Sequence, residues 1–299
     1  MRTEQMRIDP AYRERLRACG LDTVDRVLAR VDGRIAAWSR TTDTLFVPGR
    51  GGEPGFYVKR HFFPTWRSRL RGMLRGTFFR MHRGQAEYLA LRGLLAAGVP
   101  TVRPVAYGSR RRLHFVQACF LITEEVPEAR NLTTFAQDVA AGRRALAPGA
   151  RHTLVRALAA ELGRMHGCGL SHGNLFWRNV LVRAGPDGQP EFFFLDVKPL
   201  ELWTRMRGTP WWVRELAQTL VSALPFTTRT DRLRFYRQYF GGERLTPPRR
   251  AYLAAITRCA AQWQRHEERR IRMNRLFDEW NRQLADEEAR AAASGGAGA

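Results

Sequence analysis

The stretch SHGNLFWRNVLV, residues 171–182, contains polar side chains of the types that transfer a phosphoryl group. His172, Asn174 and Asn179 follow the spacing H-R-D-x-x-x-x-N, in which the aspartate accepts the proton of the attacking hydroxyl and the last asparagine binds a metal ion. Asn174 stands at the aspartate position. An amide accepts a hydrogen bond from a hydroxyl but does not take its proton at neutral pH. The stretch therefore predicts a kinase-type catalytic loop without its usual base.

Three further residues complete the set that a kinase-type site needs. Lys59, in FYVKRH, is the candidate to bind the phosphates of ATP. Glu87, in QAEYLAL, is the only acidic residue in segment 54–123 and is the candidate partner of this lysine. Asp196, in FFFLDV, stands where a metal-binding aspartate is expected, so Asn179 and Asp196 are the candidate ligands of Mg²⁺.

Each of these residues also has a purely structural interpretation. Lys59 beside Arg60 is typical of a solvated basic edge, and Glu87 on a helix rich in arginine is typical of a surface ion pair of small energy. Asp196 suits the start of a turn, His172 suits a buried core position, and asparagines suit turns because they hydrogen-bond their own backbone. Only the joint order and spacing of the residues favour the kinase interpretation.

The first part of the chain predicts a sheet with one helix behind it. After a helical lead-in at residues 22–31, the segments 34–40, 44–49 and 56–62 are short and rich in β-forming residues, which predicts a three-strand meander. Segments 102–108 and 114–126 predict two further strands. A helix between the meander and these two strands is indicated by apolar residues at helical spacing: Ala86, Leu89, Ala90, Leu94 and Ala97.

The second part of the chain is predicted to be mainly helical. Leu154, Leu158, Leu162 and Met165 form an apolar stripe that ends before the catalytic loop, and Thr246-Pro247 is a typical start of a long terminal helix. We therefore expect an α+β fold with two lobes: an antiparallel sheet lobe at residues 1–127, a helical lobe at 128–292 and a disordered tail at 293–299. Glu124 and Glu125 mark the connector, where backbone groups would meet the adenine.

The composition restricts the class of partner. A formal net charge of +22 over 299 residues predicts an anionic partner, such as nucleic acid, an anionic membrane surface or a phosphorylated glycolipid. The four cysteines are scattered without metal-ligand spacing, which is typical of reduced thiols in the cytoplasm. No apolar run approaches the roughly 20 residues of a membrane-spanning helix, and the charged N-terminal segment does not look like a secretory signal.

Several segments together resemble the lipopolysaccharide kinase family, the WaaP/InaA-like and Kdo kinase-like group. These segments are FYVKRH, AEYLALRGLLAAGVPTVRPVAYG, CFLITEEV, HGNLFWRNVLV, FLDVKPLEL and VRELAQTLVSALPFTTRTDRLRFYRQYFG, which span about residues 20–242. The resemblance implies a protein kinase-like fold and transfer of the γ-phosphate of ATP to a sugar hydroxyl of the lipopolysaccharide core. It also implies an anionic glycolipid acceptor at the inner face of the cytoplasmic membrane, which agrees with the basic charge.

Two loops depart from the kinase pattern. The turn RTTDTLF lacks the glycines that let backbone amides approach phosphates, and we expect Thr41, Thr42 and Thr44 to donate hydrogen bonds there instead. The metal loop reads LDVKP rather than D-F-G, which keeps the aspartate as its only ligand.

Two basic segments each allow two interpretations. Segment 66–83 interleaves arginines with apolar residues and contains no acidic residue, which fits a helix on a membrane surface as well as a lobe-packing insertion with a solvated arginine face. Segment 265–275, RHEERRIRMNR, fits a solvated helix better than a binding element, because acidic residues interrupt its charge.

Three functions remain as hypotheses. The first is an active sugar kinase acting on lipopolysaccharide core or a similar glycolipid, which retains Lys59, Glu87, Asn179 and Asp196. The second is a pseudokinase that binds nucleotide or glycolipid without turnover, which Asn174 and the turn without glycines suggest. The third is a basic nucleic-acid binder or a kinase with another substrate, although no nucleic-acid motif is recognisable. None of these observations sets an oligomeric state.

Overall fold

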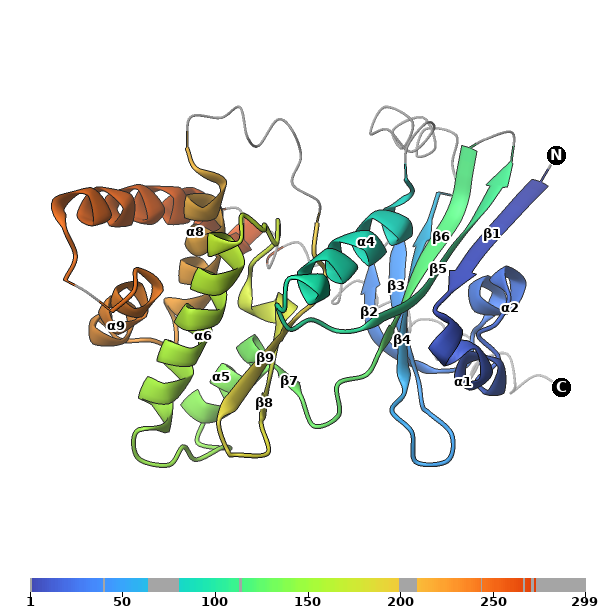
Figure 1. The fold of residues 1–299 in the computed structure, drawn as a ribbon, viewed down its shortest axis with the longest axis horizontal. Helices are drawn as coiled ribbons and strands as arrows, with labels where there is room; N and C mark the ends of the chain where they lie inside the picture. The colour runs from blue at the N-terminus through green and yellow to red at the C-terminus, as the bar shows by residue number, and fades with distance from the viewer. Residues whose placement is uncertain are drawn as a thin grey trace, which may run out of the picture.

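The computed structural model describes residues 2–39, 41–63, 81–112, 115–198, 209–242, 244–265, 267–269 and 272. A large antiparallel sheet forms one half of the molecule and a group of helices forms the other (Figure 1). Most of segment 66–83, for which a membrane-surface helix was one interpretation, lies outside the described residues. The same is true of most of segment 265–275 and of residues 293–299. Within the described ranges, no helix combines the length and the apolar character needed to span a bilayer.

The main sheet has six strands in the order β1-β5-β6-β4-β3-β2, with every neighbouring pair antiparallel. The predicted meander is confirmed as three strands: β2 (Arg34–Ser39), β3 (Thr42–Val47) and β4 (Phe56–Phe62). The two later predicted strands are β5 (Pro104–Arg112) and β6 (Phe115–Glu124). β4 and β6 thus lie in the middle of the sheet, where both edges of each strand are paired.

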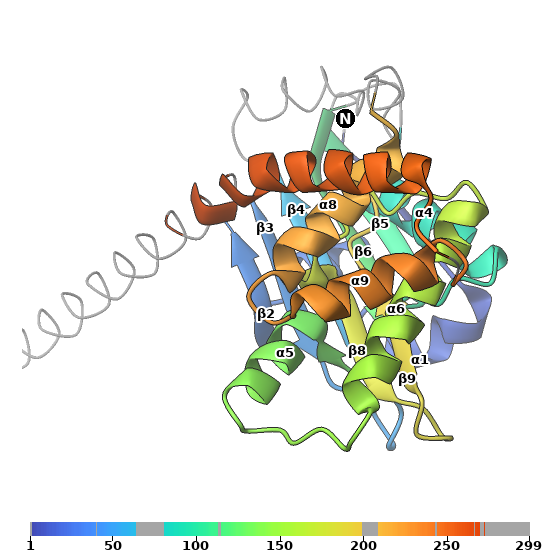
Figure 2. The same ribbon diagram turned by 90° about the vertical axis from the view of Figure 1, so that its left-hand side faces the viewer.

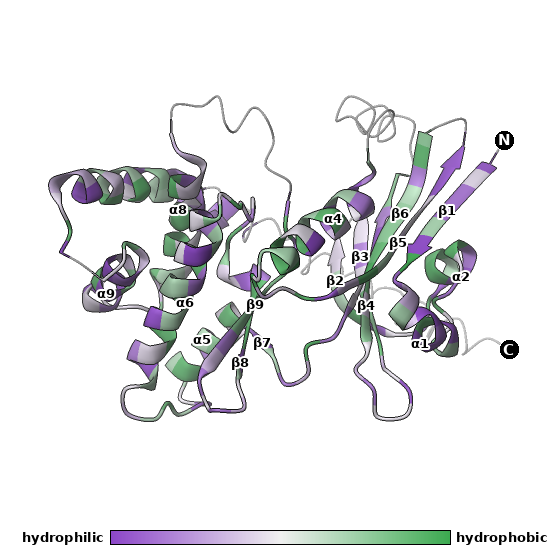
Figure 3. Ribbon diagram, in the orientation of Figure 1, coloured by the Kyte–Doolittle hydropathy of each residue, from purple (hydrophilic) through white to green (hydrophobic). Residues whose placement is uncertain are grey.

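The prediction of five strands was wrong, because the N-terminal segment adds β1 (Arg2–Ile8) beside β5. This strand is mostly exposed, so it lacks the alternation of apolar and polar residues that signals a half-buried strand. Its pairing is supported by charge, since Arg110 on β5 donates to Glu4 over 2.8 Å. Figure 3 shows the difference: hydrophobic residues dominate β6, whereas β1 is mostly hydrophilic.

One face of the sheet is covered by α4 (Arg83–Ala96), which packs on β4, β5 and β6 (Figure 1). The predicted helix is confirmed, but its buried face is Tyr88, Leu91 and Leu94, whereas Leu89 of the expected stripe is 46% exposed. A side chain at Gly84 would overlap the backbone carbonyl of Phe120, so glycine permits the helix to start close against β6.

The other face of the sheet is covered by α1 (Arg13–Ala18) and α2 (Val24–Ala29), with the 3-10 turn Pro10–Tyr12 before them. Arg60 points to this face, because side chains alternate along β4. Its guanidinium pairs with both carboxylate oxygens of Asp43 at 2.8 Å and donates to the carbonyl of Arg30 over 2.6 Å. With 6% exposure, Arg60 is a buried structural residue and not part of a solvated basic edge with Lys59.

The helical half follows a connector after β6. Its elements, in chain order, are β7 (Arg130–Asn131), α5 (Leu132–Ala140), α6 (Ala150–Gly167), a 3-10 turn (Trp177–Asn179), β8 (Val180–Ala184), β9 (Pro190–Phe194), α8 (Trp211–Ala223), α9 (Arg229–Tyr239) and a helix over residues 247–265. Figure 2 shows α9 in front of α6, with helix 247–265 across the same side. The helical stripe on α6 is confirmed, since Leu158, Leu162 and Met165 are buried. The domain boundary at 127/128 falls in the connector and stays a prediction.

Candidate active site

Lys59 lies at the centre of the candidate site, on β4 in the middle of the sheet. Its Nζ donates to Glu87 on α4, over 3.1 Å to Oε1 and 2.9 Å to Oε2. The same nitrogen donates to Oδ1 of Asp196 over 2.5 Å. These partners lie 28 and 137 positions away along the chain, so the fold brings together three residues that the sequence pattern selected. All three side chains are less than a third exposed.

Asp196 is presented by the turn that follows β9. The strand ends at Phe194, which is fully buried, and the next backbone N–H, of Leu195, donates to the carbonyl of Asn179 over 3.1 Å. Asp196 itself has φ +57°, a left-handed conformation that few non-glycine residues adopt unless their surroundings hold it. The strained turn aims the carboxylate back at Lys59.

The charges of the three residues depend on one another. Burial alone would lower the pKa of Lys59, but the carboxylates of Glu87 and Asp196 outweigh it and raise the pKa, so the amine stays protonated. Burial also raises the pKa of Glu87, with partial compensation from Lys59. For Asp196 burial is outweighed by the charges of Lys59 and Lys198 and by the hydrogen bond from Asn174, which hold the pKa below its usual range.

The two asparagines of the catalytic-loop pattern contact each other, and Asn174 also contacts the metal-loop aspartate. Asn174 donates from Nδ2 to Oδ2 of Asp196 over 2.5 Å. Asn179 donates from Nδ2 to the carbonyl of Asn174 over 2.8 Å. The Asn179 side chain is buried against the loop with its nitrogen in use, which leaves its Oδ1 as the atom suited to a cation.

His172 is completely buried and supports the catalytic loop. Its Nδ1 accepts the backbone N–H of Asn174 over 3.3 Å, and its carbonyl accepts the N–H of Lys198 over 2.8 Å. Its ring packs edge-on against Phe194 at 5.6 Å between ring centroids. Burial lowers its pKa, which keeps the ring neutral. The catalytic role of His172 stays a prediction, and these contacts are those of a residue that positions the loop.

Glu215, which the sequence analysis did not select, holds the loop from α8. Its Oε2 accepts the backbone N–H of His172 over 3.1 Å, and its Oε1 accepts that of Gly173 over 2.7 Å. Oε1 also accepts from the hydroxyl of Ser171, and Nε2 of His166 lies 3.1 Å from Oε2. Glu215 is 4% exposed, so one buried carboxylate organises the entry to the catalytic loop.

The same face of α8 also binds the next part of the loop. The N–H of Leu175 donates to Oε1 of Gln218 over 2.7 Å, and Thr219 donates to the carbonyl of Leu175 over 3.1 Å. The N–H of Trp177 donates to Ser222 over 3.1 Å. The signal for this function was polar residues spaced i, i+3, i+4 and i+7 within an otherwise apolar helix: Glu215, Gln218, Thr219 and Ser222.

The connector residues Glu124 and Glu125 bind protein groups with their side chains. Glu124 accepts from Tyr12 over 2.7 Å and from Arg15 over 2.6 Å. Glu125 accepts from the N–H of Gly55 over 2.8 Å. Their backbone N–H groups are also in use, donating to the carbonyls of residues 103 and 55. Contact with an adenine through these N–H groups is therefore ruled out in this conformation, and contact through their carbonyls stays a prediction.

The turn without glycines is a tight one between β2 and β3. Ser39 and Thr42 pair across it, and the carbonyl of Thr41 accepts the N–H of Phe62 over 2.8 Å. Thr44 lies opposite Lys59 on β4. Thr42 lies opposite His61, two residues further along β4. Contact of the threonines with a phosphate stays a prediction.

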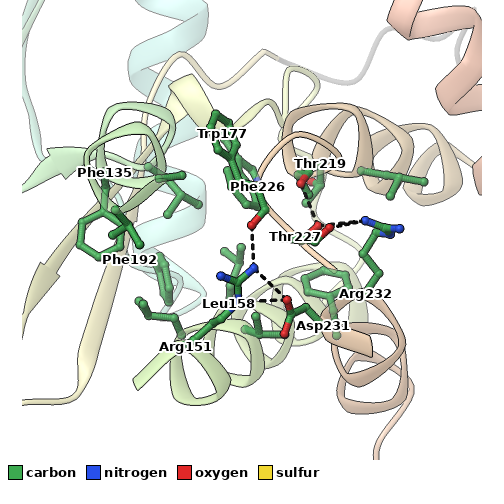
Figure 4. A pocket seen from close by; sticks show the side chains of 18 of the residues that line it. Phe135, Arg151, Leu158, Trp177, Phe192, Thr219, Phe226, Thr227, Asp231 and Arg232 are labelled. Atoms are coloured by element: carbon green, nitrogen blue, oxygen red, sulfur yellow. Dashed lines mark hydrogen bonds and ion pairs between the residues drawn. The ribbon is translucent and has the colours of Figure 1, made fainter. Parts of the chain in front are cut away.

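A cavity of about 140 Å³ lies inside the helical half between α5, α6, α8 and α9 (Figure 4). It is lined mainly by apolar side chains such as Leu158, Trp177 and Phe226, with the ion pair of Arg151 and Asp231 on one side. None of the residues around Lys59 lines it. It is thus separate from the candidate active site.

The arrangement suits transfer of a phosphoryl group. Catalysis of this reaction depends mainly on positioning and on neutralising negative charge. Here the ammonium of Lys59 and the carboxylate of Asp196 lie in contact, and Asn174 links Asp196 to Asn179 through two hydrogen bonds. In the described part of the chain, no group of three or more His, Cys, Asp or Glu side chains could hold a metal by itself.

Comparisons with known proteins show which chains this one is similar to. The model of the family described as lipopolysaccharide kinase (Kdo/WaaP) matches residues 22–239. The lipopolysaccharide core heptose(I) kinase WaaP of Pseudomonas aeruginosa is 33% identical over 204 residues, which are 67% of this chain and 74% of that protein. A 3-deoxy-D-manno-octulosonic acid kinase of Vibrio vulnificus is 27% identical over 181 residues, 58% of this chain and 64% of that protein. A solved structure of WaaP in complex with acyl carrier protein has a TM-score of 0.59 and 25% identity, covering 86% of this chain and 98% of that one.

Proposed function

Because this chain belongs to the lipopolysaccharide kinase (Kdo/WaaP) family, we propose that it transfers the γ-phosphate of ATP to a sugar hydroxyl of a lipopolysaccharide core or a similar glycolipid. Its fold is protein kinase-like, in agreement with the WaaP structure. The observation that carries the proposal is the contact of Lys59 with both Glu87 and Asp196, because it joins the sheet, α4 and the metal loop in a single ion-pair network.

We assign the phosphate-binding role to Lys59 and the metal-binding roles to Asn179 and Asp196. Glu87 fixes the lysine, since its two oxygens bind one ammonium nitrogen. The donor set of carboxylate and amide oxygens fits Mg²⁺, a cation that prefers oxygen ligands. When bound, Mg²⁺ neutralises charge on the phosphates. On ligand binding, Lys59 exchanges its contact with Asp196 for one with a phosphate and keeps its contact with Glu87.

Asn174 orients the acceptor hydroxyl in this proposal, and it does not remove the proton. Its Oδ1 accepts a hydrogen bond, which aligns the attacking oxygen. In a loose transition state the bond between the attacking oxygen and phosphorus is barely formed, so the hydroxyl keeps its proton until late in the transfer and needs little help from a base. The proton then leaves to solvent or to the transferred phosphate.

The acceptor class follows from the named activities of the relatives. WaaP of P. aeruginosa is a heptose(I) kinase of the core, and the V. vulnificus relatives are kinases of 3-deoxy-D-manno-octulosonic acid. A net charge of +22 favours an acceptor that carries phosphates or acidic sugars and an anionic membrane surface that presents it. We therefore infer peripheral association with the inner face of the cytoplasmic membrane.

A second candidate function is a pseudokinase that binds nucleotide or glycolipid without efficient turnover. The observation in its favour is that Asn174 donates to Oδ2 of Asp196, so the residue at the base position holds the metal-loop aspartate. Binding of Mg²⁺ and nucleotide without transfer distinguishes this function from the first one.

The test is magnesium-dependent transfer of labelled γ-phosphate from ATP to purified core glycolipid, with an acceptor validated on a related enzyme. We compare the wild type with Asp196→Ala and with Asp187→Ala, an aspartate in the exposed turn between β8 and β9. Labelling that Asp196→Ala abolishes and Asp187→Ala preserves supports a kinase. No labelling by the wild type, together with nucleotide binding, would favour the pseudokinase.

A further inference from the structure

His61 shares a face of the sheet with Lys59 but has no place in the kinase pattern. It lies two residues further along β4, so its side chain points to the same side as that of Lys59. It is 6% exposed, which is unusual for a polar residue on the face that carries the candidate active site.

One nitrogen of the His61 ring is bound by the turn that lacks glycines. Thr42 lies directly opposite His61 in the pairing of β3 with β4, and its Oγ1 is 3.0 Å from Nδ1. When the threonine hydroxyl donates to Nδ1, the proton of the neutral ring resides on Nε2. In this tautomer, which we adopt for the proposal below, Nε2 is a donor.

The other nitrogen, Nε2, is buried and has no hydrogen-bond partner within the described part of the chain. Buried polar atoms are satisfied in most proteins, and an exception near a site points to a missing ligand. The residues whose charge acts on this ring are Lys59, Arg83, Asp196 and His82. Lys59 and Arg83 are cations and Asp196 is the one carboxylate among them, so the group that completes the site is expected to be an anion.

The His61 ring is neutral at physiological pH, so Nδ1 can accept from Thr42 while Nε2 carries the proton. Burial, with the charges of Lys59 and Arg83 as further causes, lowers the pKa of His61 to about 3. The ring therefore offers a phosphate a single N–H from Nε2.

The position of His61 along β4 indicates which phosphate of a nucleotide its Nε2 would contact. Phe56 lies opposite Glu124 at the connector, where the adenine is expected. Lys59 follows about 10 Å further along the strand and His61 about 7 Å beyond it, at roughly 3.4 Å per residue. A nucleotide that extends from the connector past Lys59 thus brings its last phosphate nearest to His61.

We propose that Nε2 of His61 donates a hydrogen bond to the terminal phosphate of the bound nucleoside triphosphate, in place of the backbone amides of a glycine-rich loop. The inference rests on the proposed function, because it presumes a nucleotide bound at Lys59. In this view the tight turn between β2 and β3 acts through Thr42, which holds the histidine, and does not itself wrap the phosphates.

The test compares binding of ADP and of a non-hydrolysable ATP analogue, both with Mg²⁺, by fluorescence titration of the full chain. Glutamine places a donor near the position of Nε2, whereas asparagine reaches only to that of Nδ1. We expect His61→Asn to bind the ATP analogue roughly 10- to 100-fold more weakly, the usual effect of removing a hydrogen bond to a charged group, with ADP affinity unchanged. His61→Gln should stay within a few-fold of the wild type for both ligands.

Thr42→Val provides a second variant of nearly equal volume in case His61→Asn does not fold. It frees the tautomer of His61 and should weaken binding of the ATP analogue several-fold while sparing ADP. Equal affinity of His61→Asn and wild type for the ATP analogue, or an equal loss for both nucleotides in a folded variant, overturns the role of His61 and leaves the kinase proposal intact. A wild type that binds neither nucleotide overturns the proposed function itself.

Discussion

The side-chain amide of Asn174 donates a hydrogen bond to Oδ2 of Asp196 over 2.5 Å. Lys59 binds the other oxygen of the same carboxylate, so Asp196 is held on both sides. An aspartate at position 174 would have no proton to donate at neutral pH, and it would bring a second negative charge to Asp196. The asparagine that removes the usual base thus also stabilises the metal-loop aspartate when no cation is bound.

Asn174→Asp should destabilise the protein in the absence of magnesium. The change removes one hydrogen bond to a charged group and adds repulsion between carboxylates, for an expected loss of about 1–3 kcal/mol in the free energy of unfolding. The repulsion raises the pKa of the carboxylate pair, so the loss should be smaller at pH 5 than at pH 7. Urea denaturation at both pH values measures it, with Asn174→Ala as the control that removes only the hydrogen bond. Equal stability of wild type and Asn174→Asp without magnesium would contradict the interpretation.

The same variant tests the chemistry of the site when magnesium and ATP are present. If the missing base limits the rate, Asn174→Asp should transfer phosphate faster. We expect a gain near the lower end of the roughly 10²- to 10⁴-fold range of general-base catalysis, since a loose transition state needs little base. Single-turnover transfer to core glycolipid measures the rate. No gain in a variant that still binds MgATP would show that proton removal does not limit this enzyme.

Lys59→Met should cost both activity and stability, because it leaves Glu87 and Asp196 without their shared cation. Removing one partner of a buried ion pair usually costs about 3–5 kcal/mol. Adding Glu87→Gln should recover part of this loss, since a neutral amide replaces the carboxylate whose pKa burial already raises. Neither variant should transfer phosphate. Urea unfolding of the two single variants and the double variant gives the coupling energy, and additive losses would show that the pair is not coupled.

The order of Lys59, Glu87 and Asp196 along the chain was sufficient to predict that these residues meet, because each lies on or beside an element with a clear pattern. Lys59 is on an apolar strand, Glu87 on a periodic helix and Asp196 after a buried strand. Such local patterns determine the element, and the pairing follows from the fold. Residues that lie far apart in the sequence could therefore be predicted to meet, because the element that holds each of them was recognisable.

Other parts of the molecule could not be predicted in this way. β1 is an exposed edge strand held by ion pairs, so no apolar alternation marks it. Glu215 lies in a helix that reads as apolar core, and only the polar spacing on one face signals that it binds backbone amides. Glu124 is engaged by Tyr12 and Arg15 from the N-terminal segment, a contact between positions more than a hundred residues apart.

Arg60→Met should destabilise the fold without changing nucleotide affinity, in contrast to its neighbour Lys59. Arg60 lies on the opposite face of β4, where it pairs with Asp43 and donates to three backbone carbonyls after and within α2. Loss of this buried cation should cost about 3–5 kcal/mol. Thermal unfolding measures the cost, and ADP titration below the unfolding temperature measures affinity. A large loss of affinity in the folded variant would mean that both faces of β4 contribute to the site.

Glu215→Gln should lower the free energy of unfolding at neutral pH and make that free energy depend less on pH in acid. Burial would raise the pKa of Glu215, but the hydrogen bonds from His166 and Ser171, together with the charge of His166, outweigh it and lower the pKa. A carboxylate with a lowered folded-state pKa contributes stability above its unfolded pKa, about 4.3 for glutamate, and this contribution is lost as the pH falls through the folded value.

Glutamine also turns a donor toward the backbone N–H groups that the carboxylate accepts. We therefore expect a loss of about 2–4 kcal/mol at pH 7, which shrinks as the pH falls below about 4. Urea denaturation from pH 7 to pH 3 measures the difference, with Glu191→Gln, in a surface pair with Arg183, as the control. Parallel stability curves for wild type and Glu215→Gln would mean that the carboxylate charge does not hold the loop. In the folded variant, a slower transfer rate at unchanged nucleotide affinity would show that Glu215 positions Asn174 for the reaction and has no part in binding.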